Sequence, residues 1–192
     1  MKKYLLIFVA MCGMASMATA QSHIEYKWRG FYSVVDYSYM FNLTRATDTV
    51  SAHMLGFSAG FQFRKETAVG GGVYYVADPT GAFTQLPIFV ELRSHFMRSQ
   101  LTPYTVLQAG YSLAVGSSSQ EAPYIKIDEG GLYFSFEVGA RYAIDRSFAV
   151  GAHLGYKLLQ SNTVTRSDIN HNPLKADAVV LHAMNVGVCL YF

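Results

Sequence analysis

The sequence lacks long apolar runs, carries few charges and contains almost no cysteine. No segment after residue 20 reaches 18 consecutive apolar residues, which excludes an ordinary membrane-spanning helix there. Charged residues make up 15% of the chain, against about 25% in soluble domains. Of its two cysteines only Cys189 lies beyond residue 20, so an internal disulfide is excluded there and we expect a buried free thiol.

Aromatic residues and glycine are abundant instead. The 192 residues, enough for one domain, include 14 Tyr, 13 Phe and 16 Gly. Aromatic enrichment without long apolar runs favours β-strands over membrane helices.

Residues 1–20 have the layout of a secretory signal peptide. Lys2 and Lys3 precede an apolar stretch, and Ala18-Thr19-Ala20 provides a small-x-small cleavage site. The alternative is an uncleaved membrane anchor. We therefore expect a mature domain over 21–192. Its 13 remaining basic residues match its 13 acidic ones, so the formal charge of +2 does not indicate nucleic-acid binding.

Apolar and polar residues alternate repeatedly in segments of about ten residues, the signature of transmembrane β-strands. The clearest segment covers 131–142, where Leu132, Phe134, Phe136 and Val138 fall on one face and Ser135, Glu137 and Arg141 on the other. The alternation predicts strands in eight regions: 28–39, 55–63, 68–77, 86–95, 103–115, 131–142, 148–158 and 179–192.

The strands of a soluble β-sandwich also alternate between apolar and polar residues. The two folds differ in whether the apolar face of each strand points inward, as in a sandwich, or outward to lipid, as in a membrane barrel. Here the apolar faces are long and unbroken, and the polar faces are rich in Gly, Ser and Tyr, which suits apolar side chains toward lipid and a narrow packed interior. Short links at 65–67, 98–102 and 145–146 alternate with long polar links at 40–52, 116–130 and 160–178, and only the short link Asp78-Pro79-Thr80-Gly81 breaks the trend. The pattern predicts an all-β fold, an eight-stranded antiparallel up-and-down transmembrane β-barrel with both termini on the periplasmic side.

Aromatic residues gather near the expected strand ends, as in the girdles of membrane barrels. The expected girdle residues are Tyr26, Trp28, Phe96, Tyr104, Tyr142, Phe148 and Phe192 at the periplasmic ends, and Tyr39, Phe41, Tyr75 and Phe134 nearer the outer ends.

The carboxyl-terminal strand has an apolar residue at every second position back from Phe192, including Leu190 and Val188. This resembles the signal by which the barrel assembly machinery recognises outer-membrane barrels. Further short motifs are Leu86-Pro87-Ile88-Phe89-Val90-Glu91-Leu92-Arg93, Pro103-Tyr104, Ala109-Gly110-Tyr111-Ser112, Gly131-Leu132-Tyr133-Phe134 and Leu154-Gly155-Tyr156-Lys157. With them the chain resembles the OmpA-transmembrane and OmpX class of small barrels, and the "porin family" barrels common in Bacteroidetes. The resemblance implies the barrel fold and a bacterial outer-membrane location, not a mechanism. As partners we expect outer-membrane lipid and lipopolysaccharide, and no nucleic acid.

The polar faces predict an ionisable network inside the barrel, because buried charges need partners. Its expected members are Asp36, Glu91, Arg93, His95, Glu137, Arg141, His153 and Lys157, with Arg64 also expected to point inward. We expect Glu91 and Glu137 to meet Arg93, Arg141 or Lys157 and to keep the barrel rigid and closed to ions. The alternative is a narrow ion-conducting path.

No spacing of chemistry-bearing residues matches a known catalytic, metal or cofactor motif, so we expect none of the three. We expect a non-enzymatic protein with a structural or surface-interaction role in its external loops and an unidentified ligand. Ile125 and Ile127 could extend the strands at 103–115 and 131–142 beyond the membrane and leave an edge for strand addition. The rival function is an enzyme acting on lipid A, with His182 as its outward-facing histidine.

Overall fold

The computed structural model describes residues 29–42, 51–64, 66–77, 79, 84–97, 99–116, 125–161, 163–167, 173–176 and 179–192. The expected signal peptide, with Tyr26 and Trp28, lies outside these residues. The described part of the chain contains no helix that is both long enough and apolar enough to cross a membrane.

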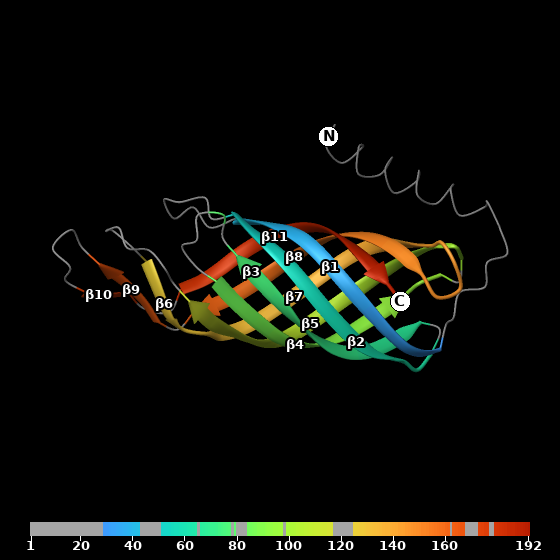
Figure 1. The fold of residues 1–192 in the computed structure, drawn as a ribbon, viewed down its shortest axis with the longest axis horizontal. Coiled ribbons are helices and arrows are strands. Elements are labelled where there is room, and N and C mark those ends of the chain that lie inside the picture. The colour runs from blue at the N-terminus through green and yellow to red at the C-terminus, as the bar shows by residue number, and fades with distance from the viewer. Residues whose placement is uncertain are drawn as a thin grey trace, which may run out of the picture.

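Eight strands close into one antiparallel barrel, as the alternation predicted (Figure 1). Consecutive barrel strands are neighbours, and the last strand pairs with the first, with Val34 opposite Tyr191 and Phe41 opposite Met184. The ring therefore has no free edge. The barrel strands are β1 (Gly30–Asn42), β2 (Ser51–Gln62), β3 (Thr67–Ala77), β4 (Thr84–His95), β5 (Leu101–Gly116), β7 (Gly131–Ala143), β8 (Ala149–Ser161) and β11 (Val179–Tyr191).

Three short strands form a second sheet beyond one rim of the barrel, at the end opposite the carboxyl terminus (Figure 1). They are β6 (Ile125–Glu129), β9 (Thr163–Ser167) and β10 (Pro173–Ala176), in the order β10-β9-β6. Because β6 directly precedes β7 and β9 follows β8, their pairing continues the β7–β8 ladder outward.

This sheet corrects one expectation and refines another. The regions 116–130 and 160–178 are not plain loops, because they contain β6, β9 and β10. The segment around Ile125 and Ile127 forms β6, which continues β7 outward as expected and pairs with β9. The alternation is too short in these segments to distinguish a strand from a polar loop.

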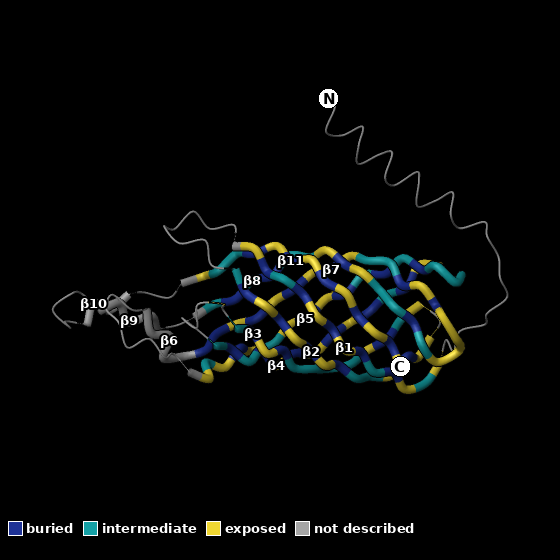
Figure 2. Tube along the Cα trace, turned by 45° about the horizontal axis from the view of Figure 1, so that its top comes forward, coloured by how far each residue is buried: buried dark blue, intermediate teal, exposed yellow. Residues whose placement is uncertain are grey.

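Side chains alternate between an exposed outer face and a buried interior along every barrel strand (Figure 2). The outer face carries large apolar residues such as Phe57, Val90, Leu132 and Leu154, each more than half exposed. Such a surface is stable against hydrocarbon and would aggregate in water. The short connections from β2 to β3, from β4 to β5 and from β7 to β8 lie at the end that holds the carboxyl terminus.

Leu154→Arg should destabilise the folded barrel by about 2–4 kcal/mol in lipid vesicles, because it places a charge midway along the lipid-facing side of β8. The measurement is urea unfolding followed by tryptophan fluorescence and heat-modifiable gel migration. Ser147→Arg, in the exposed turn before β8, is the matched control and should change little. Equal stability of the two variants would contradict a lipid-facing position for Leu154.

Candidate functional site: the polar interior of the barrel

The interior consists of a polar belt between two apolar clusters. Nearer the carboxyl terminus lie Tyr32, Val34, Ala68, Tyr104, Val106, Ala143, Ala149, Cys189 and Tyr191. Toward the opposite rim lie Met40, Ala52, Met54, Tyr74, Val76, Phe89, Tyr133, Leu159 and Ala183. The charged side chains lie between these clusters or, for His95 and Arg141, level with the first of them, and all are buried.

All eight ionisable residues of the expected network are buried, none more than 6% exposed: Asp36, Glu91, Arg93, His95, Glu137, Arg141, His153 and Lys157. Two other expectations are wrong. Arg64 is exposed in the turn after β2, because the strand ends at Gln62 and the alternation stops there. Tyr104 does not belong to the lipid-facing girdle, because its ring is buried inside the barrel.

Glu91 on β4 is the centre of the first group of hydrogen bonds. Tyr32 Oη donates to its Oε1 at 2.8 Å, and Ser58 Oγ donates to the same oxygen at 3.2 Å. Arg93 Nη2 and Gln108 Nε2 approach its Oε2 at 3.2 and 3.3 Å. Four neighbours therefore contact one buried carboxylate, and their hydrogen bonds offset the cost of removing its charge from water.

Aromatic rings surround the two arginines. The Arg93 guanidinium carbon lies 5.9, 5.6 and 5.1 Å from the ring centres of Tyr32, Tyr104 and Tyr191, and Arg93 Nη1 donates to Tyr191 Oη at 2.5 Å. Arg141 lies 5.3 Å from the Tyr191 ring. Cation–π contacts add to the ion pair here, where water is excluded.

Lys157 on β8 is the centre of the second group. Its Nζ donates to Glu137 Oε1 at 2.6 Å, to Tyr133 Oη at 3.2 Å and to Ser135 Oγ at 3.4 Å. It also lies 4.5 Å from the centre of the Tyr74 ring. Three acceptors match the three protons of the ammonium group.

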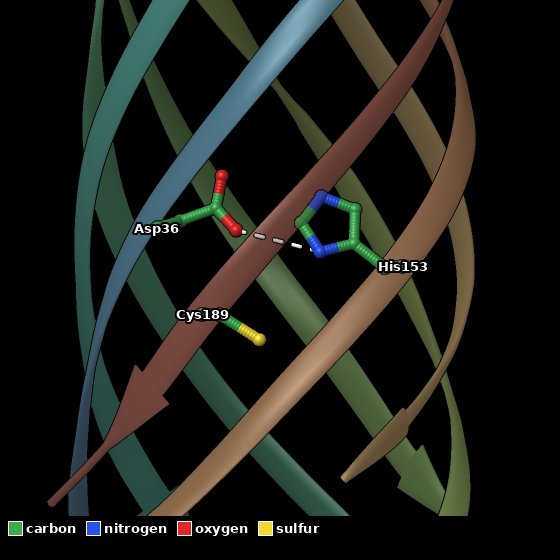
Figure 3. Close-up of side chains that lie close together, drawn as sticks. All are labelled: Asp36, His153 and Cys189. Atoms are coloured by element: carbon green, nitrogen blue, oxygen red, sulfur yellow. Dashed lines mark ion pairs between the residues drawn. The ribbon is translucent and has the colours of Figure 1, made fainter.

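A third group brings Asp36, His153 and Cys189 together from β1, β8 and β11 (Figure 3). Asp36 Oδ2 lies 3.5 Å from His153 Nδ1. His153 Nε2 lies 3.9 Å from Glu137 Oε2, so the imidazole stands between two carboxylates. Tyr104 Oη lies 3.3 Å from Cys189 Sγ.

The charges of the belt balance. Asp36, Glu91 and Glu137 face Arg93, Arg141 and Lys157, three acids to three bases, so with neutral histidines the interior has no net charge. A cavity of about 10 Å³ lies among Asp36, Glu137, His153 and their neighbours. That volume holds about one water molecule, far less than a small-molecule site requires.

Tyrosine hydroxyls were the part of the site that sequence reasoning missed. Tyr32, Tyr74, Tyr133 and Tyr191 supply hydroxyls or ring faces to four of the charged groups, namely Glu91, Arg93, Arg141 and Lys157. The available signal was the tyrosine content of the polar faces. On the outer surface two tyrosines contact histidines: Tyr37 Oη lies 2.8 Å from His53 Nδ1, and Tyr156 hydrogen-bonds to His182.

Comparison with known families decides the class of the protein. The family model described as "Outer membrane protein beta-barrel domain" matches residues 6–192. The chain belongs to this family. It is therefore a bacterial outer-membrane protein of the small OmpA- and OmpX-like type. No curated protein shows a significant sequence match.

Solved structures of outer-membrane barrels share the fold. Neisserial surface protein A has a TM-score of 0.60 at 13% identity, with 84% of this chain and 96% of that chain covered. OprG from Pseudomonas aeruginosa has a TM-score of 0.61 at 15% identity, with 88% and 99% covered. The outer-membrane protein AlkL has 0.52 at 15%, with 90% and 94% covered. At such identities the likeness concerns the fold alone.

Lys157→Met should destabilise this family member by about 3–5 kcal/mol, because it leaves the Glu137 carboxylate buried without its cation. Glu137→Gln/Lys157→Met should be less destabilised than Lys157→Met, since neither charge then remains. Urea unfolding in micelles measures both, with Arg64→Gln in the exposed turn as control. If Lys157→Met were as stable as the control, the Glu137–Lys157 ion pair would not contribute measurably to the free energy of unfolding.

Proposed function

We propose that this protein is a non-enzymatic outer-membrane barrel that is plugged by its own side chains and acts at the cell surface through the sheet β6-β9-β10. The carrying observation is the packed interior. Every charged group described in the belt has a polar or aromatic neighbour within the wall, and the cavity among them has room for about one water molecule.

A barrel that has no open pore can still anchor external segments at the membrane surface, and we propose that this is its main role. The sheet β6-β9-β10 emerges directly from three adjacent wall strands, β7, β8 and β11, so its backbone is held by the barrel. In barrels of this class the long connections face outside and the short turns face the periplasm. A sheet in that position suits contact with lipopolysaccharide or with another protein by strand addition.

Wild-type protein in planar bilayers should give no discrete conductance steps, because no continuous water path crosses the polar belt. Insertion is checked by heat-modifiable migration of the same sample. A variant with Tyr74, Tyr104, Tyr133 and Tyr191 all replaced by alanine empties much of the interior and should raise the current. Reproducible steps from the wild type would overturn the plugged barrel and favour the ion-conducting alternative.

Replacing residues 163–176 with a short Gly-Ser linker should leave the barrel intact and remove its surface contacts. The ladder Tyr133–Ala143 with Ala149–Leu159 lies within the wall and does not need the external sheet. Cross-linking on intact cells followed by mass spectrometry measures the contacts, and a variant shortened at 79–83, between β3 and β4, is the matched control. Identical cross-links in wild type and the linker variant would exclude the external sheet as the interaction surface.

A further inference from the structure

The side chains of Asp36, His153 and Cys189 meet inside the barrel wall where its first and last strands join. Asp36 on β1 lies directly opposite Cys189 on β11 in the strand register. His153 on β8 lies opposite Gly187, two residues before Cys189. One potential ligand atom from each residue lies within 4.8 Å of the other two (Figure 3).

We propose that these three residues form a site for one borderline divalent metal ion, Zn²⁺ being the best match. Carboxylate oxygen, imidazole nitrogen and thiolate sulfur are all zinc ligands. Tetrahedral coordination at ordinary zinc bond lengths separates ligand atoms by roughly 3.3–3.8 Å. The Asp36 Oδ2 to His153 Nδ1 distance of 3.5 Å already fits, so the sulfur needs the larger adjustment.

Unsatisfied polar atoms point to a missing partner at this position. Among the described residues, Asp36 Oδ1 has no hydrogen-bond donor although the side chain is buried. The only described ion pair of its other oxygen is with His153 Nδ1, at 3.5 Å. A buried carboxylate with an orphaned oxygen is costly, and a cation bound at Oδ2 would offset part of the cost of burying the charge.

The surroundings supply the outer contacts that zinc ligands use. His153 Nδ1 faces Asp36, while its Nε2 lies 3.9 Å from Glu137 Oε2 and has no hydrogen-bond partner in the described part of the chain, so a small movement would let this carboxylate orient a metal-binding imidazole. Tyr104 Oη, 3.3 Å from Cys189 Sγ, can donate to a thiolate. Lys157 and Arg93 do not compete for Asp36 as close ion-pair partners, because Glu137 and Glu91 hold them.

Glycines opposite two of the ligands keep the space clear. A Cβ at position 187 would come within 2.6 Å of the His153 ring, and one at position 151 within 2.8 Å of Cys189 Sγ. Side chains there would push the imidazole or the sulfur out of place. As the chain folds around the ion, the thiol of Cys189 loses its proton to the surrounding water, and the sulfur becomes a metal ligand without any change of oxidation state.

Such an ion would fasten β1, β11 and β8 to one another across the seam that closes the ring. The metal-site proposal shares one assumption with the proposed function: the interior is packed, and the ion therefore has a structural role. The site does not require an open path through the barrel. A barrel that conducts ions but binds zinc would refute the plugged barrel and leave the metal site standing, so the two tests fail independently.

The test uses the mature barrel refolded in detergent micelles with Co²⁺ present, because the packed wall restricts later entry. The folded fraction is measured by heat-modifiable migration, and excess metal is removed by desalting. We expect one Co²⁺ per folded chain and a thiolate-to-cobalt charge-transfer band in the near ultraviolet. Refolding with Zn²⁺ present together with Co²⁺ should suppress that band. Folded wild-type protein that retains no metal, or retains it without the thiolate band, would overturn the proposal.

Variants assign the ligands. Cys189→Ser should abolish the charge-transfer band, and Asp36→Asn should weaken Zn²⁺ binding at least tenfold. His53→Gln, which removes a histidine from the outer face, is the matched control and should bind as the wild type does. Binding unchanged in both ligand variants would refute the site. If a variant does not fold, the wild-type stoichiometry and spectrum alone decide.

Discussion

The rest of the structure depends on satisfying backbone hydrogen bonds where no water is available. In hydrocarbon every unpaired N–H and C=O group is costly, so a β-sheet can span the membrane only as a closed ring. The pairing of β1 with β11 closes that ring. Once it is closed, alternate side chains must face lipid or the interior, and the inverted polarity of the protein follows from geometry.

The narrow interior then determines which residues can be tolerated there. Eight strands enclose a space that side chains fill, so each charge that the alternation places inside must find its partner locally. Glu91 with Arg93 and Glu137 with Lys157 meet this requirement across neighbouring wall positions, and tyrosines complete their shells. Among the described residues, the same packing that stabilises these pairs leaves the cavity beside Glu137 and Asp36 with room for about one water molecule.

The fold could be predicted from the sequence because strand alternation and link length are local signals. Leu132 to Val138 shows the period without ambiguity, and the burial of Glu137 and Arg141 followed from it. Arg64 was misplaced because alternation does not reveal where a strand ends. The convergence of Asp36, His153 and Cys189 could not be predicted at all, since it depends on the registers of three strands that lie far apart in the sequence. The short external strands β6, β9 and β10 could not be predicted for a different reason. A segment of four or five residues is too short to show a clear alternation of apolar and polar side chains.

The seam between β1 and β11 has a consequence for the order of events during folding. Its partners, such as Val34 and Tyr191, are separated by nearly the whole chain, and contacts of such long range form slowly. Until the last strand arrives, β1 and every strand built on it present an open edge and an oily surface. The chain must therefore be shielded from premature association while in transit. The β1–β11 pairing can form only after the last strand is in place, so an interaction that holds these two strands together acts on the closure of the wall.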